Sequence, residues 1–329
     1  MGLLAGLRIG TPALGAVLAL TLAAARTLAQ APPNPSREMA VTFDDLPGVV
    51  APGEGTEQLR ALTEKLVGAI VSERIPAVGF VNEGKLAPNG LRDPERVALL
   101  ARWVSANLEL GNHTYSHLDL HRVPLERFEE DVVSGEELTT SLLSPRNRRL
   151  RYFRHPYLHT GRSLETRKSL NEFLAARGYR VAPVTLDNSD WIFARAYALA
   201  KQRGDRGAVQ EVAEAYVPYM LAKIEYFERQ SVRLFSREIR QILLVHANAL
   251  NADYFSDLVA RLRARGYAFC TLERALEDPA YGSADTYTGA GGITWLHRWA
   301  LTSGGRHAIL PGEPATPRLV MDAAGVSEE

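Results

Sequence analysis

The sequence predicts a distorted (β/α) barrel of about seven parallel strands, with a helical insertion before the last strands. Short apolar runs rich in β-forming residues alternate with amphipathic segments of helical period along most of the 329 residues. Several of these runs end directly in a carboxylate, guanidinium or imidazole side chain. The carboxyl ends of parallel strands are where the active sites of barrel enzymes collect, so the pattern also predicts a functional site.

The first predicted strand spans Met39 to Pro47 and ends in the adjacent acids Asp44 and Asp45. Its β-forming apolar residues predict a buried strand, and Pro47-Gly48 should stop it. Carboxylates are costly to bury unless they are paired or bind a metal ion. A turn capped by one of the two acids is the structural alternative.

The remaining predicted elements follow in order. Strands are expected at 75–81, 108–112, 150–154, 179–187, 241–246 and 267–272, and helices at 53–74, 93–104, 125–143, 163–177 and 252–265. The segment 192–240 is helical in pattern throughout and is the predicted insertion. From about Ala280 the chain is rich in Gly and Pro, which predicts a surface extension with one short helix and disordered last residues. Trp295 and Trp299 in this extension are expected to pack, although a sugar-stacking platform is the alternative.

Composition and the amino terminus bound the class of protein. A formal net charge of zero gives no electrostatic footprint for nucleic acid or anionic lipid. The single cysteine, Cys270, lies in an apolar run and is expected to be a small buried hydrophobe. Arg8, an apolar stretch over 11–25 and Ala29-Gln30-Ala31 predict a signal peptide over 1–31, with an uncleaved anchor as the alternative. The mature protein is therefore expected to be secreted or periplasmic, with a catalytic domain over 36–280 and an extension over 281–329.

Five clusters of polar side chains follow predicted strands. His113 and His117 are four residues apart, which on one helical turn would let both imidazoles hold one divalent metal ion. His117 and His121 have the same spacing, so spacing alone does not choose the pair. Two histidines need a further ligand, and a carboxylate from another strand end would supply it. The other clusters are Asp44-Asp45, Arg154, Asp187 with Asp190, and His246, each of which has a structural alternative as an ion pair, a cap or a core residue.

The order of these motifs resembles the polysaccharide deacetylase family, which is the NodB homology domain of carbohydrate esterase family 4. The resemblance rests on Thr-Phe-Asp44-Asp45, His113-Thr-Tyr-Ser-His117, Arg154-His-Pro156-Tyr157, Asp190-Trp191 and Leu244-Val-His246. It implies that Asp45, His113 and His117 bind a divalent metal ion, usually Zn²⁺ and sometimes Co²⁺, Ni²⁺ or Mn²⁺. His121 falls outside the motif.

The resemblance also implies the catalytic roles. Asp44 would be the general base for the metal-bound water, and Arg154 would hold it ionised and oriented. His246 would protonate the departing amine with Asp190 beside it, and the Tyr157 backbone N–H would stabilise the oxyanion. Trp191 and Pro156 would contact the sugar. Base and acid must act on different sides of the reacting carbon, so Asp44 and His246 are expected on well-separated strands.

The predicted function is removal of N-acetyl groups from an N-acetylglucosamine polysaccharide of peptidoglycan or chitin type. An O-deacetylase of acetylated xylan and a catalytically silent glycan-binding protein are the alternatives. Two departures from the compact family pattern leave the substrate open. Segment 192–240 could be a lid, a groove wall, a partner surface or a neutral insertion, and the loop after Pro156 is longer than the compact form.

Overall fold

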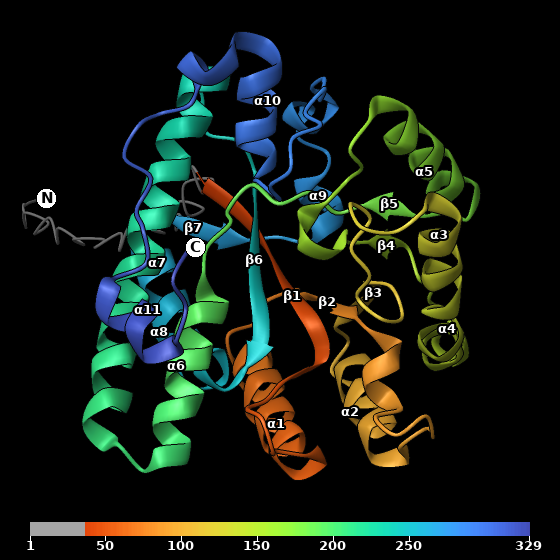
Figure 1. Ribbon diagram of the computed structural model, residues 1–329, viewed down its shortest axis with the longest axis vertical. Coiled ribbons are helices and arrows are strands. Elements are labelled where there is room, and N and C mark those ends of the chain that lie inside the picture. Colours follow the sequence, from red (N-terminus) through yellow and green to blue (C-terminus); the bar gives the residue numbers. More distant parts are fainter. Residues whose placement is uncertain (1–36) are drawn as a thin grey trace, which may run out of the picture. The chain divides into compact units, whose positions relative to one another are not determined.

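A computed structural model describes residues 37–329, which lie in one α/β unit (Figure 1). The predicted signal peptide over 1–31 falls outside the described residues and stays a prediction. Within the described part of the chain, no helix is long and apolar enough to cross a membrane.

A parallel sheet of seven strands forms the centre of this unit, as the sequence predicts. The strands are β1 (Arg37–Val49), β2 (Val78–Val81), β3 (Glu109–Asn112), β4 (Tyr152–Phe153), β5 (Arg180–Val181), β6 (Gln241–Asn248) and β7 (Tyr267–Phe269). Their order is β5-β4-β3-β2-β1-β6, and β7 pairs with the first residues of β1. The sheet curls into a half-barrel, and the long strands β1 and β6 lie side by side in the middle of the view (Figure 1). The predicted fold class is therefore confirmed.

Strand β1 runs further than its sequence predicts. Pro47-Gly48 does not stop it, because the pairing with β6 shifts register between Asp44 and Val49 and then resumes. Within this irregular stretch Asp45 adopts a left-handed backbone, with φ of 74°. The strand therefore bends at the point where its two acids enter the site, as β-bulges do beside active sites.

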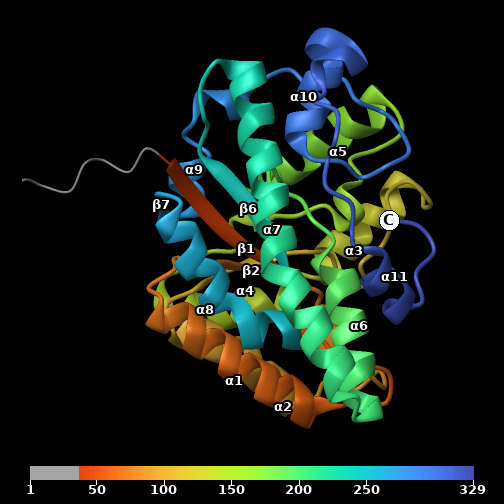
Figure 2. The same cartoon turned by 90° about the vertical axis from the view of Figure 1, so that its left-hand side faces the viewer.

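Helices cover the sheet. They are α1 (Thr56–Ser72), α2 (Pro94–Ser105), α3 (Leu125–Ser134), α4 (Glu137–Leu143), α5 (Leu164–Ala176), α6 (Asp190–Arg203), α7 (Arg206–Phe235), α8 (Ala249–Ala264), α9 (Leu272–Ala275), α10 (Trp295–Gly304) and α11 (Arg318–Ala324), with a 3₁₀ turn over Pro156–Leu158. Figure 2 shows α1 packed beside α8 along one edge of the unit. The predicted single helix over 125–143 is wrong: it divides at Gly135, where a Cβ atom would lie 2.9 Å from the backbone of Thr114 and Tyr115. This break lets the helix approach the loop that carries His113 and His117.

The predicted helical insertion is present as α6 and α7. Both helices bury aromatic side chains, among them Phe193, Tyr216 and Phe227. They pack on each other, and α6 also packs on α8 and α11. The insertion is therefore part of the hydrophobic core of the unit and not an appendage.

The predicted character of the C-terminal extension is wrong. Two helices, α10 and α11, form there, and the last residue is held by hydrogen bonds from Thr316 and Ser189 to the Glu329 carboxylate. Trp295 and Trp299 are buried, which confirms the prediction that they pack and do not form an exposed sugar-stacking platform. The one short helix that the sequence predicts is α10. The Gly- and Pro-rich composition misled about the last residues because what orders them, such as the hydrogen bond from Ser189 to Glu329, comes from residues distant in sequence.

Candidate active site

The two acids at the end of β1 face a cavity beside β6. Asp44 is 2% exposed, and its register partner on β6 is His246. The prediction that these two residues come from well-separated strands is wrong, because residues distant in sequence occupy neighbouring strands here. Their side chains both line one cavity, so a reacting group would lie across the two strands.

Asp45, His113 and His117 form a cluster of metal-ligating side chains. One ligand atom from each lies within 4.8 Å of the others. Asp45 Oδ1 is 3.8 Å from His113 Nε2 and 3.6 Å from His117 Nε2, close to the roughly 3.4 Å that separates ligand atoms of a tetrahedral zinc ion with bonds near 2.1 Å. Asp45 Oδ1 is also buried without a hydrogen-bond partner among the described residues. A cation would satisfy this oxygen, so the donor set fits a divalent metal ion.

The two histidines are prepared as neutral ligands. Burial lowers the pKa of His113 to about 4, and burial with the neighbouring His113 lowers that of His117 to about 4. The Nδ1–H of His113 donates to the Arg154 carbonyl at 2.8 Å, which leaves Nε2 free toward Asp45. Such a bond fixes the tautomer of a metal-binding histidine.

The loop from His113 to His117 is not the helical turn that their spacing suggests. Thr114 and His117 both have left-handed backbones, with φ of 64° and 57°. The imidazole rings nevertheless come together, with centroids 4.8 Å apart. Strained backbone of this kind persists where the surrounding structure holds it, often at functional sites.

Asp44 lies beside a buried arginine, as the sequence predicts. The Arg154 Nη1 is 3.8 Å from Asp44 Oδ2, and its Nη2 donates to the Thr42 hydroxyl at 2.8 Å. Burial raises the pKa of Asp44, and the charge of Arg154 opposes that rise. Asp44 lines the cavity, and its Oδ1 is buried with no hydrogen-bond partner among residues 37–329.

His246 is held by a buried carboxylate. Its Nδ1–H donates to Asp190 Oδ1 at 2.7 Å, while Asp190 Oδ2 accepts from the His246 N–H, Asn251 and Asn248. Burial disfavours the charged ring, but Asp190 outweighs it and raises the pKa of His246 to about 9. Tyr216 of α7 donates to Asn251, so the insertion supports this network.

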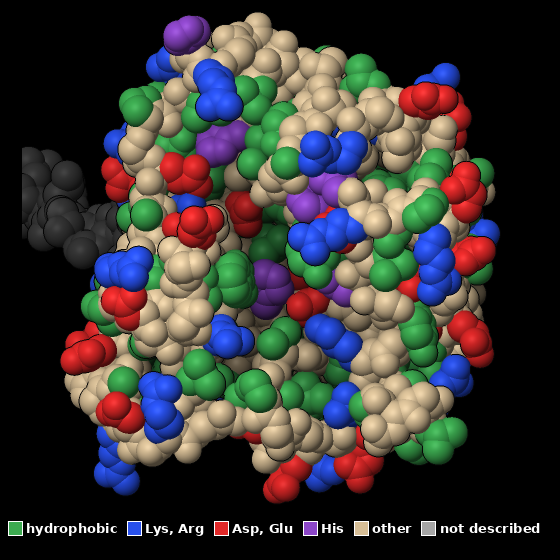
Figure 3. All heavy atoms as spheres, viewed as in Figure 1, with side chains coloured by type: hydrophobic (Ala, Val, Ile, Leu, Met, Phe, Trp, Pro, Cys, Tyr) green, Lys and Arg blue, Asp and Glu red, His purple; other side chains and the backbone are tan. Residues whose placement is uncertain are grey.

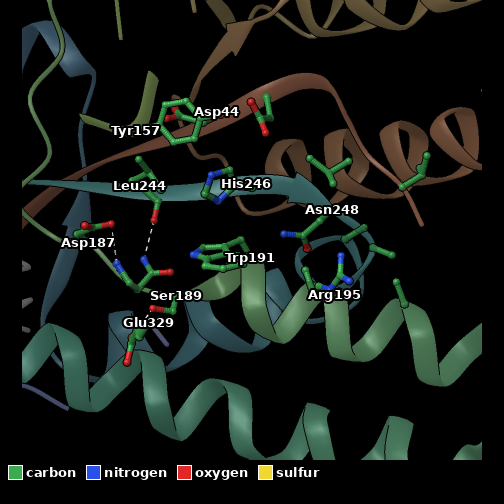
Figure 4. A pocket seen from close by; sticks show the side chains of 18 of the residues that line it. Asp44, Tyr157, Asp187, Ser189, Trp191, Arg195, Leu244, His246, Asn248 and Glu329 are labelled. Carbon is green, nitrogen blue, oxygen red and sulfur yellow. Dashed lines mark hydrogen bonds between the residues drawn. The ribbon is translucent and has the colours of Figure 1, made fainter. Parts of the chain in front are cut away.

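One cavity of about 1230 Å³ is lined by Asp44, Asp45, His113, His117 and His246. In Figure 3 histidine and acidic side chains gather in the central hollow. Asp44, Tyr157, Trp191 and His246 surround the same space (Figure 4). Tyr157 and Trp191 are 55% and 45% exposed, so both can form walls for a sugar ring. Pro156 is buried and does not line the cavity, so the structure does not support its predicted contact with the sugar.

Residues 31–176 match the family model described as polysaccharide deacetylase. This match covers Asp44, Asp45, His113, His117, Arg154 and Tyr157 in sequence order. Over this part of the sequence the chain is similar to polysaccharide deacetylases. The match ends before Asp190 and His246, so the inclusion of these two residues rests on their geometry.

Solved structures of carbohydrate esterase family 4 are similar to this chain. A pseudoenzyme from Bacillus anthracis is 14% identical over 74% of this chain and 67% of its own, with a TM-score of 0.49. A family 4 carbohydrate esterase from Bacillus anthracis is 19% identical over 74% and 83%, and a peptidoglycan deacetylase from Bacillus subtilis is 19% identical over 74% and 91%. The TM-score is 0.44 for both.

A second histidine cluster lies among the described residues, and its geometry is unsuited to a metal ion. Asp119, His121 and His159 bring ligand atoms within 4.8 Å of one another. The two rings are stacked, however, with centroids 3.8 Å apart and an interplanar angle of 8°. Lone pairs of parallel rings lie in parallel planes and do not converge on one ion. His121 Nε2 also accepts from the Gly161 N–H and His159 Nδ1 contacts Asp119, so these atoms are already occupied.

Metal binding separates the two clusters. We expect one equivalent of Zn²⁺ to bind in equilibrium dialysis, and His117→Ala to weaken its affinity by more than about 100-fold, because loss of a ligand should exceed the 10–100-fold typical of outer-shell changes. His121→Ala is the matched control and should leave affinity and stoichiometry unchanged. Retention of tight binding in His117→Ala, or its loss in His121→Ala, would contradict this assignment.

Several residues that support the site carry no signal in the sequence. Lys85 Nζ is 3.3 Å from Asp45 Oδ2 and donates to the Asp45 carbonyl. Asn82 donates to the His113 carbonyl at 2.6 Å, and Thr42 and Asn251 hold Arg154 and Asp190. All are common polar residue types, and only the three-dimensional arrangement distinguishes them from surface positions.

Proposed function

We propose that this protein is a secreted, metal-dependent hydrolase that removes N-acetyl groups from N-acetylglucosamine-containing polysaccharide. One observation carries the proposal: Asp44, the Asp45-His113-His117 cluster and His246, which the buried Asp190 holds, line one cavity. Zn²⁺ is the favoured ion because two imidazoles and one carboxylate suit it and leave a position open. Secretion is carried by the predicted signal peptide alone.

The residues of the chain divide the chemistry between them. Asp45, His113 and His117 would hold a divalent ion, which when bound would activate a water molecule and polarise the acetyl carbonyl. Asp44 accepts a proton from the attacking water as the new carbon–oxygen bond forms. The charge of Arg154 favours the ionised form of Asp44 in which it can do so. The Tyr157 N–H is the proposed donor to the developing oxyanion.

His246 completes the reaction. As the carbon–nitrogen bond breaks, the imidazolium gives its proton to the departing nitrogen, so acetate and a free amine leave. A pKa near 9 keeps this ring protonated at neutral pH, as an acid for a poor leaving group requires. An ester releases a better leaving group and needs this acid less. The His246-Asp190 pair therefore favours the amide substrate over acetylated xylan.

Acetate release tests the proposal. We expect zinc-loaded protein to release acetate from chitin oligomers or N-acetylated peptidoglycan. Removal of the metal ion with a chelator should abolish this activity, and addition of Zn²⁺ should restore it. Acetylated xylan is the matched ester substrate. Release of acetate from xylan alone would mean that the protein is an O-deacetylase and not an N-deacetylase. Tight glycan binding without acetate release from any of these polymers would instead identify a binding protein.

A further inference from the structure

The turn that carries Tyr157 has an unfavourable backbone. Tyr157 and Leu158 are both non-glycine residues with left-handed φ, at 57° and 55°. Two such residues in succession are disfavoured by contact between Cβ and the backbone, so neighbouring structure must hold the turn. Within residues 37–329 the Tyr157 N–H donates no hydrogen bond to the protein. The turn thus holds an unused donor beside the cavity.

A segment far along the chain covers this turn. We refer to residues 285–298 as the strap. Its Gly292 lies so close to the turn that a Cβ atom there would be 1.7 Å from the Tyr157 carbonyl oxygen and 2.8 Å from its carbon. The neighbouring Gly291 has no such contact, since the nearest atom to a Cβ there would be a side-chain carbon of Ile293 at 3.7 Å. Of these two neighbouring glycines, only Gly292 approaches the Tyr157 carbonyl closely.

A buried arginine of α10 ties the strap to the same turn. Arg298 is 1% exposed and donates to the Leu158 carbonyl at 3.4 Å and to the Thr160 hydroxyl. Its Nε donates to Asp285 at the other end of the strap at 2.8 Å. The Arg298 guanidinium thus links Asp285, at the start of the strap, to Leu158 and Thr160, which follow Tyr157.

The strap is itself anchored to the body of the fold. The Trp295 N–H donates to the Val184 carbonyl at 2.8 Å, and Arg167 of α5 donates to the Asp285 carbonyl at 2.7 Å. The Ala290 carbonyl faces His121 Nδ1 at 3.3 Å. Because both ends are fixed, the strap can hold the strained turn in place.

We propose that Gly292 and Arg298 are positioning residues that hold the turn at Tyr157 in place, so that the Tyr157 N–H, which lies in the peptide just before the one that Gly292 contacts, serves the reaction. This inference rests on the proposed function for its catalytic consequence, while the mechanical link stands on the contacts alone. The C-terminal extension is then a working part of the active site. A Cβ at position 292 must push the Tyr157 carbonyl away and rotate the peptide that precedes Leu158.

The test compares Gly292→Ala with Gly291→Ala in the full chain. A misplacement of about 1 Å costs on the order of 100-fold in rate, so we expect Gly292→Ala to lower kcat by about that factor with KM and zinc affinity near wild type. Gly291→Ala should retain wild-type kcat. Amide hydrogen exchange over 155–161 in the metal-free protein should be faster in Gly292→Ala than in wild type and unchanged in Gly291→Ala.

A milder variant guards against misfolding. Thr160→Val keeps the shape of the side chain but removes one acceptor of Arg298, so we expect a smaller kcat loss, of about threefold to tenfold for one hydrogen bond, with faster exchange in the same segment. Unchanged exchange in both Gly292→Ala and Thr160→Val would overturn the mechanical link. Faster exchange with unchanged kcat would overturn the positioning role. If the wild-type protein releases no acetate, the proposed function fails, and the exchange comparison still decides the link.

Discussion

Replacing Asp44 by asparagine is expected to lower kcat for acetate release by about 10³-fold, the middle of the range for a positioned general base. Asp44 lines the cavity, and its Oδ1 is buried and has no hydrogen-bond partner among the described residues. An amide has nearly the same shape but cannot accept the proton of the attacking water. The measurement is steady-state acetate release with zinc-loaded protein, together with zinc affinity by dialysis.

The zinc affinity of Asp44→Asn should stay close to wild type, because the ligand cluster uses Asp45 and not Asp44. Asp253→Asn is the matched control: this carboxylate lies on the same cavity wall but pairs with Lys65 and Tyr197. We expect its kcat to remain within about twofold of wild type, as for a surface ion pair. Loss of zinc from Asp44→Asn, or a kcat above about one tenth of wild type, would contradict the assignment of the base.

The apolar runs of strands could be predicted from the sequence because they are local features. The run before Asp44 and Asp45 is enough to place both acids on a strand, and the same holds for His246, but β1 continues to Val49 and β6 to Asn248, beyond the predicted ends. The order of strands is not local. Asp44 and His246 lie about 200 residues apart in sequence yet are register partners. They are partners because β6 pairs with one side of β1, while β2 to β5 lie on the other side of β1.

The supporting residues could not be predicted for a related reason. Lys85 and Asn82 follow β2, where they contact groups that reach them only after the chain folds. The strap is a stronger case: its Gly-rich sequence is typical of a loop, and the function of Gly292 depends on the position of one carbonyl oxygen in another loop. Periodicity and motif spacing carry no information on such close approaches.

Replacing Asp190 by asparagine is expected to lower kcat by about 10³- to 10⁴-fold, by analogy with the loss of a carboxylate that orients a catalytic histidine. The reason lies in the donors around it. The His246 N–H, Asn248 and Asn251 all donate to Asp190 Oδ2, so the oxygen of the introduced amide must occupy that place. Its NH₂ group then faces His246 Nδ1, which must give up its proton to accept.

In that arrangement His246 is a neutral ring, protonated at Nε2, and too weak an acid for an amine leaving group. The wild-type rate should fall as pH rises through the pKa of about 9 that Asp190 maintains, because the acid must be protonated. Without that carboxylate the alkaline limb should move to lower pH, toward the ordinary value of 6.5. The measurement is the pH profile of kcat for acetate release.

A double variant separates this role from simple destabilisation. If Asp190 acts through the imidazole, Asp190→Asn combined with His246→Gln should be no slower than His246→Gln alone, because groups that act as a unit are not additive. An additive loss, or an alkaline limb that stays in place, would mean that Asp190 only supports the fold. A shift of the alkaline limb to lower pH, together with non-additive rates, would identify His246 as the acid and Asp190 as the group that keeps it protonated.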